Sequence, residues 1–424
     1  MGNEESALVA ESVKPSTLTE RSLAAVAAYL NDEPKQRKVV VLTGAGISTA
    51  AGIPDFRSPK TGLYNNLARL NLPYAEAVFD MAYFRAHPEP FYVLARELYP
   101  GKFHPTVSHA FIKLLDDKGM LQMLFTQNID CLERRAGVPA DKIVEAHGSF
   151  ATQRCIECRA AFPGDLMTEH VARGAVPRCR EAGCAGTVKP DIVFFGEMLP
   201  AAFGERAGHA RAADLVLVMG TSLTVHPFAG LPELAAEGRP RVLLNLERVG
   251  RLGTRPDDVV ELGECDEGIR KLADALGWRD ELEACWRAVV GHEEADRQLR
   301  SAGGGGREVE VEVEDEVRKL AEGVEEALRL GESEDEDGAG PSAEQGRDRT
   351  QMMGDEGLEA GVSEEESAAK GGHSMATAES LPETPETRVE KHVPRAAAEA
   401  AGSETVDEKE KEKEKEKEVE KPSL

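Results

Sequence analysis

Aromatic residues are scarce in this 424-residue chain, and its C-terminal part has none. From position 301 to the end there is no Phe, Tyr or Trp, and 36 Asp and Glu residues outnumber 16 Lys and Arg residues, a net charge of −20. Such a segment cannot bury enough apolar surface to offset the conformational entropy that folding removes. We therefore expect residues 301–424 to form a disordered acidic tail.

Long apolar runs are missing as well. No stretch of 18 apolar residues occurs, so we expect no transmembrane helix, and the first 22 residues are too polar for a signal peptide. Four of the seven cysteines lie close together, which favours a metal site in a reducing compartment over a disulfide scaffold. We expect a cytoplasmic protein, with the nucleus as a second location.

The residues before position 301 carry a net charge of only −6 and can hold a large core plus a small satellite module. Residues 18–30 have the apolar spacing of an amphipathic helix, which should pack on a sheet that begins at Val39. Residues 62–119 have a mostly helical pattern that several prolines interrupt, so we expect a helical insertion there.

The most informative stretch is 39–59. Residues 39–42 are a short β-branched apolar run, typical of a buried parallel strand. Gly44 and Gly46 follow, and glycines let the backbone turn tightly and approach a ligand without Cβ contacts. A helix that begins there points free N–H groups at a phosphate. A single Gly-x-Gly is not specific, because glycine occurs in many loops.

A dehydrogenase-type dinucleotide fold is not favoured. That fold needs a third glycine, a continuing helix and an acidic residue about 20 residues further on. Thr49 occupies the third glycine position, and Pro54 and Pro59 end any helix early. The glycine turn therefore leads into a loop, residues 55–57, that brings an acid, an aromatic ring and a guanidinium beside the ligand.

Polar or small residues follow several other predicted strands. The strand at 120–125 leads into Gln127, Asn128 and Asp130, at the kind of strand end where open α/β sheets bind ligands. Asn128 and Asp130 could equally cap a following helix. Three further predicted strands end in the same way: 214–219, 241–244 and 259–262. This pattern predicts one long nucleotide cleft along a Rossmann-like, doubly wound parallel sheet.

His147 is the candidate general base. A lone histidine is more often a packed or surface residue than a catalyst, but here Gly148 follows at once and a cysteine cluster begins eight residues later. The pKa of imidazole lies near working pH, so the ring can accept a proton and return it.

Two cysteine pairs predict a zinc site. Cys155 and Cys158 are followed, after 20 residues, by Cys179 and Cys184, which fits tetrahedral Zn²⁺. Four thiolates leave no open position, so this zinc should be structural and hold a small ribbon-like module.

The cysteine spacing would also suit a nucleic-acid-binding ribbon. Basic residues nearby support that alternative: Arg154, Arg159, Arg173, Arg178, Arg180 and Lys189. Acidic residues dilute them: Glu157, Asp165, Glu169 and Glu181. We therefore expect no direct contact with nucleic acid.

The motifs together resemble the sirtuins, a family of NAD-dependent protein deacylases. Gly-Ala-Gly-Ile-Ser at 44–48 and Gly-Ile-Pro-Asp-Phe-Arg at 52–57 are similar to the family signature. Gln-Asn-Ile-Asp at 127–130, His-Gly at 147–148 and Val-Phe-Phe-Gly-Glu at 193–197 follow in the family's order. The resemblance spans about 18–290 and is closest to the class I cytosolic deacetylases, the sirtuin-two type, and their fungal members. The second cysteine pair departs from the pattern, being spaced by four residues rather than two.

The resemblance implies a role for each motif. It implies NAD contacts at Gly44, Ala45, Gly46, Ile47, Ser48, Thr49, Asp55, Phe56, Arg57, Gln127, Asn128, Ile129, Asp130, Gly220, Thr221, Ser222, Asn245, Leu246, Glu247 and Cys265. It implies substrate-peptide contacts at Val193, Phe195, Gly196, Glu197 and Val225. An extended peptide would add to the 193–197 edge through main-chain hydrogen bonds, while a pocket takes the acyl-lysine.

The activity implied is NAD-dependent deacetylation of acetyl-lysine in proteins such as histones. The acetyl oxygen attacks the ribose carbon as nicotinamide leaves, His147 deprotonates a ribose hydroxyl, and free lysine and O-acetyl-ADP-ribose result. Alternatives on the same site are mono-ADP-ribosyl transfer and removal of longer acyl chains. A zinc-ribbon protein that binds acylated peptides or nucleic acid without turnover is the alternative from another class.

The expected domain organisation follows from these motifs. Residues 1–17 form a flexible N-terminus and 18–292 the catalytic domain. Its parts are the nucleotide-binding segments 18–57, 115–150 and 190–292, the helical insertion 60–114 and the zinc module 151–189. In the tail, apolar residues on one face over 313–330 allow a helix, which either stays marginal in solvent or docks and modulates activity.

The first six residues match the myristoylation pattern, with Gly2 as the acceptor. Glu4 and Glu5 make the match poorer, and no cysteine before Cys131 offers a second acylation site. One myristoyl chain gives only marginal membrane binding, roughly 10⁴ M⁻¹. We expect an acylated Gly2 on a largely soluble protein with at most weak membrane association.

Overall fold

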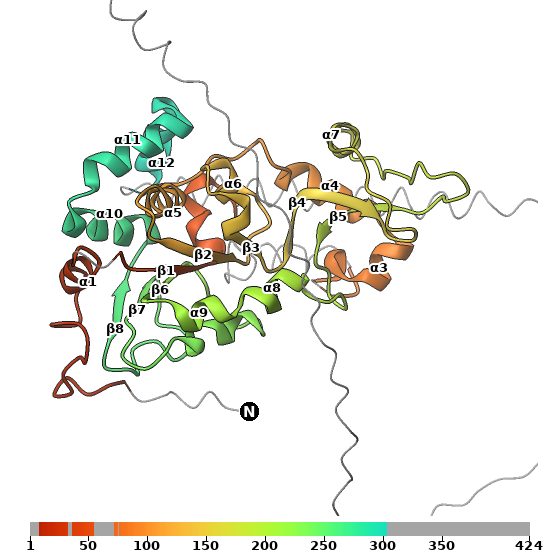
Figure 1. Ribbon diagram of the computed structural model, residues 1–424. Coiled ribbons are helices and arrows are strands. Elements are labelled where there is room, and N and C mark those ends of the chain that lie inside the picture. Colours follow the sequence, from red (N-terminus) through yellow and green to blue (C-terminus); the bar gives the residue numbers. More distant parts are fainter. Residues whose placement is uncertain (1–7, 33–35, 55–71, 75, 303–424) are drawn as a thin grey trace, which may run out of the picture. The chain divides into compact units, whose positions relative to one another are not determined.

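A computed structural model describes residues 8–32, 36–54, 72–74 and 76–302 (Figure 1). The loop at 55–57, Gly2 and the predicted tail helix at 313–330 lie outside these residues. The fold described below is that of the part N-terminal to the tail.

Six parallel strands form the central sheet, in the order β3-β2-β1-β6-β7-β8. They are β1 (Val39–Thr43), β2 (Leu121–Thr126), β3 (Ile143–Glu145), β6 (Leu215–Met219), β7 (Arg241–Asn245) and β8 (Asp258–Leu262). If the six strands of this sheet are numbered in chain order, their order across the sheet is 3-2-1-4-5-6. This is the strand order of doubly wound nucleotide-binding folds. The predicted fold class is confirmed, and the strand order reverses between β1 and β6.

Helices cover both faces of the sheet, as Figure 1 shows. One face packs against α1 (Leu23–Leu30), α5 (Val107–Asp117), α10 (Cys265–Leu276) and α11 (Arg279–Val290). The other packs against α8 (Ala201–Arg206), α9 (Gly208–Ala212) and the 3-10 helix η5 (Phe228–Leu234). Strands that are buried on both faces read as continuous apolar runs, which is why β1 and β6 were recognisable in the sequence.

The first helix is shorter than expected. It begins at Leu23 rather than at residue 18, and the Ser22 hydroxyl caps it by accepting from the Ala25 N–H at 3.1 Å. The backbone N–H groups of residues 16–18 donate instead to the Asp257 carboxylate. These bonds hold residues 16–18 against the residue that precedes β8, and the helix starts only after them.

A glycine separates two of the C-terminal helices. Gly277 ends α10 with a positive φ of 74°. A further helix, α12 (His292–Ala302), follows α11, and its Arg297 guanidinium donates to the Ala51 carbonyl at 3.0 Å. The helix at the end of the described chain therefore reaches back to the loop that follows β1.

A second hydrophobic core joins the helical insertion to the cysteine-containing module. Its elements are η3 (Ala77–Phe79), α3 (Met81–Ala86), α4 (Glu89–Leu98), α7 (Gly164–Ala172) and the antiparallel pair β4 (Gly148–Cys155) and β5 (Val188–Ile192). Phe91 and Phe194 pack edge-to-face with ring centroids 5.1 Å apart, so the aromatic residues of the insertion serve as core.

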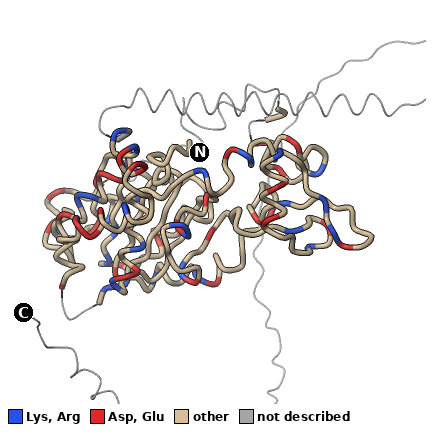
Figure 2. Tube along the Cα trace, turned by 90° about the horizontal axis from the view of Figure 1, so that it is seen from above, with Lys and Arg blue, Asp and Glu red and all other residues tan. Residues whose placement is uncertain are grey.

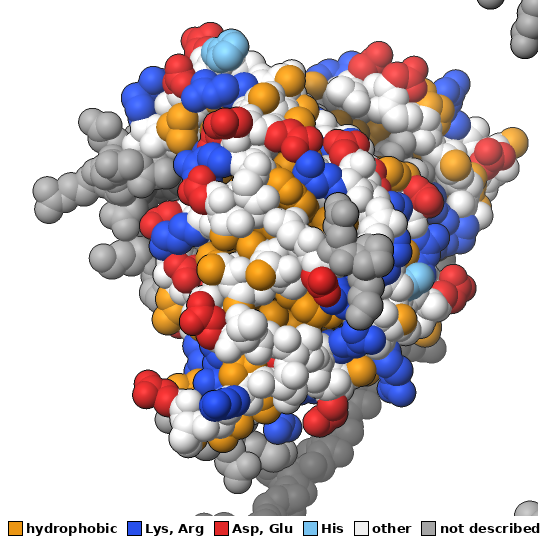
Figure 3. All heavy atoms as spheres, turned by 60° about the vertical axis from the view of Figure 1, so that its left-hand side comes forward, with side chains coloured by type: hydrophobic (Ala, Val, Ile, Leu, Met, Phe, Trp, Pro, Cys, Tyr) orange, Lys and Arg blue, Asp and Glu red, His pale blue; other side chains and the backbone are white. Residues whose placement is uncertain are grey.

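Basic and acidic residues are interspersed along the described chain, and neither kind forms a separate charged region (Figure 2). The same mixture appears on the face that Figure 3 brings forward, where charged side chains of both signs surround scattered apolar ones. No helix in the described part is long and apolar enough to cross a membrane.

Candidate functional site

The glycine turn lies where the strand order reverses. The Gly46 N–H donates to the Gly220 carbonyl at 2.9 Å, and the Gly44 N–H donates to the Met219 carbonyl at 3.2 Å. A Cβ on Gly46 would lie 2.7 Å from the Gly220 Cα. Only glycine fits at this close crossing of the loops after β1 and β6, which explains the Gly-x-Gly spacing.

The segment after the turn is short, as the prolines predicted. Two 3-10 helices follow: η1 (Ala45–Ile47) and η2 (Thr49–Ala51). Gly52, with a φ of 95°, ends the second. The N–H groups of Gly44, Gly46, Ile47 and Ser48 donate to backbone carbonyls, so the turn is held by its own hydrogen bonds.

A buried polar network lies beside the glycine turn. The Asn128 side-chain amide donates to the Gly44 carbonyl at 3.2 Å and to Ser48 Oγ at 3.4 Å. The Ser48 hydroxyl donates to Asp130 Oδ2 at 2.7 Å. Asp130 also accepts from the Leu132 N–H at 2.9 Å, at the start of α6 (Leu132–Arg135). Asp130 therefore accepts at the start of a helix, as weighed from the sequence, and also holds this network; its contact with a ligand stays a prediction.

The loops after β2 and β6 are tied together. The Gln127 amide donates to Thr221 Oγ1 at 2.6 Å, and the Leu223 N–H donates to the same oxygen at 3.2 Å. The loop after β7 is closed by Asn245, whose amide donates to the Glu247 carbonyl at 2.8 Å. These loops leave the same edge of the sheet, so the predicted cofactor residues among those that the structure describes lie along that edge.

Two cysteines near this edge are not nucleophiles. Burial raises the pKa of the Cys265 thiol to about 12, and its Sγ lies 3.4 Å from the Leu244 carbonyl. Burial likewise raises the pKa of Cys131 to about 12. Both thiols are neutral at physiological pH, so Cys265 can contribute packing and backbone groups only.

His147 follows β3, and its ring orientation is fixed. Its Nδ1 lies 3.1 Å from the Gln127 carbonyl oxygen, which accepts a hydrogen bond and therefore needs the ring proton on Nδ1. In the neutral ring Nε2 then carries the lone pair and can accept a proton. The side chain is half-buried, next to the loop that carries Asn128.

Gly148 is required because β4 and β5 pass very close to each other next to His147. Its φ is 66°, and a Cβ at this position would lie 1.9 Å from the Asp191 carbonyl oxygen. The backbone of β5 thus passes too close to β4 for any side chain here. The His-Gly pair has a structural reason in addition to its chemical one.

The four predicted zinc ligands converge. Their sulfur atoms lie within 4.8 Å of one another, with Cys155 and Cys184 3.6 Å apart and Cys158 and Cys179 3.5 Å apart. A Zn–S bond of about 2.3 Å in a tetrahedron requires sulfurs about 3.8 Å apart. All seven cysteines of the chain are free thiols, so the set fits Zn²⁺ in spite of the longer second spacing.

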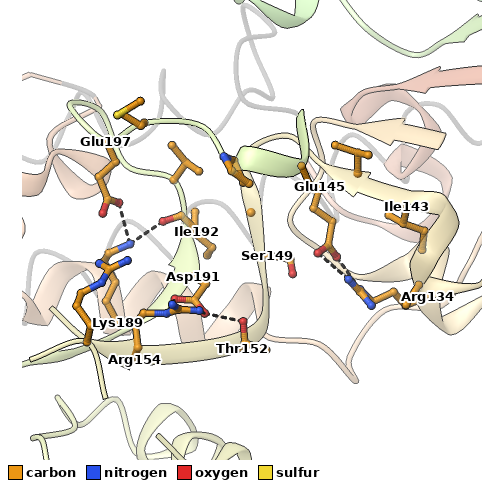
Figure 4. Close-up of a pocket in the computed structure, with 18 of the residues that line it drawn as sticks. Arg134, Ile143, Glu145, Ser149, Thr152, Arg154, Lys189, Asp191, Ile192 and Glu197 are labelled. Atoms are coloured by element: carbon orange, nitrogen blue, oxygen red, sulfur yellow. Dashed lines mark hydrogen bonds and ion pairs between the residues drawn. The ribbon is translucent and has the colours of Figure 1, made fainter. Parts of the chain in front are cut away.

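A cavity of about 520 Å³ lies between the sheet and the cysteine module, and Figure 4 shows charged residues along it. Lys189 is 5% exposed, and its ammonium donates to the Ile192 carbonyl at 2.6 Å and pairs with Glu197 at 2.9 Å. Arg154 forms a bidentate pair with Asp191. Two of the basic residues weighed for nucleic-acid contact are therefore engaged with groups at and beyond the end of the module.

The segment predicted to bind the peptide is held in place by backbone hydrogen bonds. The Val193 N–H donates to the His147 carbonyl and the Phe195 N–H to the Phe79 carbonyl, each at 2.8 Å. The Glu197 carboxylate accepts from the Phe194 N–H at 2.9 Å, which shapes the turn at Gly196. Phe195 is 48% exposed. The peptide contacts of this segment and of Val225 stay predictions.

Sequence reasoning missed two buried groups. One is Lys189, which bonds the segment around Ile192 and Glu197 and looked like a surface charge in the sequence. The other is the pair His109 and Glu133, which lies against Asp130. A helical His and a helical Glu, 24 positions apart, carry no shared pattern that would have flagged them.

Comparisons with known proteins agree with this site. A sequence model of the Sir2 family matches residues 44–227. "NAD-dependent protein deacetylase hst2-1" of Emericella nidulans is 58% identical over 334 residues, 78% of this chain and 91% of its own length. "NAD-dependent protein deacetylase hst2" of Schizosaccharomyces pombe is 53% identical over 60% of this chain and 77% of its own.

A more distant relative shows the same similarity. "NAD-dependent protein deacetylase sirtuin-3" of Mus musculus is 51% identical over 247 residues, 58% of this chain and 73% of its own length. With the glycine turn, the ordered histidine and the thiol cluster already located, an identity of 58% across most of both chains leads to one conclusion: the protein is a member of the Sir2 family, the sirtuins.

Proposed function

We infer that this protein is an NAD-dependent protein-lysine deacetylase. The observation that carries the inference is the meeting, at one sheet edge, of the glycine turn and a histidine whose Nδ1 is fixed by the Gln127 carbonyl. Relatives that are more than half identical are named NAD-dependent protein deacetylases.

The chain offers matching groups for each part of NAD. The glycine turn at 44–46 suits the pyrophosphate, because it lies where the strand order reverses, the place at which doubly wound folds bind a dinucleotide. The Asn128, Ser48 and Asp130 network suits the nicotinamide and its ribose. When bound, NAD would supply the electrophilic ribose carbon, to which the acetyl oxygen of the substrate lysine bonds as the bond to nicotinamide breaks.

His147 supplies the proton transfer. Since Nδ1 donates to the Gln127 carbonyl, Nε2 is the nitrogen that accepts a proton from a hydroxyl. The same carbonyl stabilises the imidazolium that forms, because its oxygen keeps accepting from Nδ1. The zinc is not needed for any of these steps, since four thiolates would fill its coordination sphere.

An assay with a defined product tests the proposal. The purified full chain is incubated with an acetyl-lysine peptide with and without NAD, and the products are identified by mass spectrometry. We expect free lysine peptide, nicotinamide and O-acetyl-ADP-ribose in equal amounts, only when NAD is present. ADP-ribosylated peptide would instead support mono-ADP-ribosyl transfer, and no turnover would support a binding protein without catalysis.

The physiological range of substrates is a finer proposal. We propose that acetylated proteins, histones among them, are the substrates, and that acetyl is preferred over longer or acidic acyl groups. A matched panel of histone peptides with acetyl, succinyl and myristoyl groups on one lysine tests this by kcat/KM. Faster removal of a longer chain would contradict the acetyl preference.

We further propose a cytoplasmic protein with a nuclear pool and a myristoylated Gly2. Seven free thiols suit a reducing compartment. Mass spectrometry of the native N-terminal peptide tests the modification, and an unmodified Gly2 or an acetylated Met1 would refute it. Imaging of the full chain with an internal label tests the location.

A further inference from the structure

A buried lysine lies beside the segment that is predicted to bind the substrate peptide. Lys189 is on β5 and is 5% exposed, and Figure 4 shows its side chain pointing toward Ile192 and Glu197. Moving an ammonium group out of water carries a large free-energy penalty unless the group is paired and hydrogen-bonded. An apolar side chain of similar length would avoid that penalty, so the charge at this position needs an explanation.

The ammonium group of Lys189 has three acceptors, one for each of its protons. Nζ donates to the Ile192 carbonyl at 2.6 Å and to the Pro190 carbonyl at 3.2 Å, and it pairs with the Glu197 carboxylate at 2.9 Å. Nζ also lies 4.3 Å from the centre of the Phe194 ring, a distance typical of a cation–π contact. Lys189 therefore contacts both the strand that leads into the predicted peptide segment and the segment itself.

Glu197 connects Lys189 to a tight turn at 194–197. The Glu197 N–H donates to the Phe194 carbonyl at 2.9 Å, and the Phe194 N–H donates to Glu197 Oε2 at 2.9 Å. The same Oε2 atom pairs with Lys189. Gly196 has a φ of 90°, as the third residue of a type II turn requires. The carboxylate thus bonds the backbone at the start of the turn and the buried cation at once.

The backbone on one side of this turn is already engaged. The Phe195 N–H donates to the Phe79 carbonyl at 2.8 Å, and the Phe195 carbonyl accepts from the Met81 N–H at 3.4 Å. The Phe195 N–H is therefore unavailable to a peptide, although the side chain of Phe195 is 48% exposed. A peptide strand that adds here needs backbone donors from neighbouring residues, and the conformation of the turn sets their orientation.

We propose that Lys189 is a positioning residue for the substrate peptide: through Glu197 it holds the turn at 194–197 in the conformation that a peptide strand meets. The inference rests on the proposed function, because the contact of this turn with the peptide is part of that proposal. Without the ammonium group, the Glu197 carboxylate has lost its cation, and we expect it to turn toward solvent and release the Phe194 N–H.

Two neighbouring arginines are engaged with other carboxylates. Arg154 on β4 forms a bidentate pair with Asp191 at 2.7 and 2.8 Å. Arg134 on α6 forms a bidentate pair with Glu145 at 2.7 and 2.8 Å. Arg154 lines the same cavity as Lys189 but forms its ion pair away from Glu197, so it offers a matched control.

Peptide binding by Lys189→Met is the first test, because Met keeps an apolar stem of similar length and removes the cation. The dissociation constant of a fluorescent acetyl-lysine peptide is measured by anisotropy, and that of NAD by calorimetry. We expect peptide binding to weaken about tenfold and NAD binding to stay within about twofold of wild type. Arg154→Met should leave both within about twofold. Equal weakening of peptide and NAD binding, or unchanged peptide binding in a folded variant, would overturn the proposal.

A double-mutant cycle tests whether Lys189 acts through Glu197. Peptide dissociation constants are compared for Lys189→Met, Glu197→Gln and the double variant. The double variant should bind about as well as the weaker of the single variants, because both changes break the same interaction. Losses that multiply would show two independent contributions and contradict the proposal. Lys189→Arg, which keeps a cation for Glu197, should bind peptide within about threefold of wild type; a loss as large as that of Lys189→Met would also contradict it.

A spectroscopic measurement on the wild-type chain depends neither on turnover nor on the folding of Lys189→Met. In protein labelled with ¹⁵N at lysine side chains, the ammonium of Lys189 should give a slowly exchanging signal that is absent from Lys189→Arg. Adding acetyl-lysine peptide should shift this signal, whereas NAD alone should not. A missing signal, or no shift with peptide, would overturn the inference even in an active deacetylase. A peptide-induced shift in an inactive protein would support the inference and refute the deacetylase function.

Discussion

At the scale of single residues, a backbone group sets the chemistry of His147. Its Nδ1 donates to the Gln127 carbonyl, so Nε2 carries the lone pair in the neutral ring and can accept a proton. The backbone of the loop after β2 thus prepares the ring for work as a general base.

At the residue scale, His147→Ala should abolish deacetylation while NAD binding and thermal stability change little. The ring is half-buried, and its Nδ1 donates to a backbone carbonyl. Removing a general base lowers the rate of the catalysed step by a factor of about 10²–10⁴. Turnover and NAD binding are measured side by side, with His292→Ala, an exposed histidine on α12, as the control. Full activity in folded His147→Ala would refute the assignment.

Burial and the neighbouring Asp130 raise the pKa of Glu133 to about 8, which predicts a pH dependence of stability. The folded state keeps the proton up to about pH 8, whereas the unfolded chain releases it near the ordinary value of 4.5. Stability from this group is full below pH 4.5 and is lost as pH rises toward 8. Glu133→Gln should therefore gain stability relative to wild type between pH 5 and 8, whereas the exposed control Glu205→Gln should not. Urea unfolding at both pH values measures the difference.

Substitutions at Gly148 and Gly277 distinguish the stability cost of a steric clash from the stability cost of backbone strain. Both have positive φ, but a Cβ on Gly148 meets the Asp191 carbonyl at 1.9 Å, while one on Gly277 meets nothing within 4 Å. Gly277→Ala should lower the free energy of unfolding by about 1 kcal/mol. Gly148→Ala must also move β5 and should cost at least about 2 kcal/mol more. Equal losses would show that the strands separate easily.

At the scale of elements, the cysteine module depends on its metal. Substituting Cys155 by Ala should release zinc, unfold the module and remove activity indirectly, because β4 continues from His147 through Gly148 to Cys155. Metal analysis should give one zinc per wild-type chain, and Cys285→Ala, a thiol outside the cluster, should keep it. A stable, active and zinc-free Cys155→Ala would contradict this expectation.

Elements with a strong local signal were predictable, and those fixed by distant contacts were not. Apolar runs gave the buried strands, and glycine and proline gave the end of the turn after β1. The start of α1 was misplaced because Asp257, more than 200 positions away, takes the preceding N–H groups. The roles of Lys189 and Glu133 were invisible for the same reason: burial and partner are properties of the fold.

At the scale of the whole molecule, the described fold should not need the tail. The core clusters are built from residues that end at Ala295. Truncation after Ala302 should leave unfolding and basal kinetics unchanged, which would favour a tail that stays in solvent. Truncation after Gly291 removes α12, whose Arg297 bonds the Ala51 carbonyl, and should weaken NAD binding and cost about 1–3 kcal/mol of stability.

A change in kinetics or oligomeric state after the first truncation would instead support a regulatory tail. Comparing both truncations on one NAD titration distinguishes the contribution of α12 from that of the residues beyond it.

The contact between Arg297 and Ala51 also has a consequence for thermodynamic linkage. It joins the last described helix to the segment that follows the glycine turn. Linkage is reciprocal, so a ligand at the turn that favours this bond must order α12 by the same factor by which the bond favours the ligand. Protection of the α12 amides from hydrogen exchange would then rise with NAD concentration, and Arg297→Ala would remove that dependence.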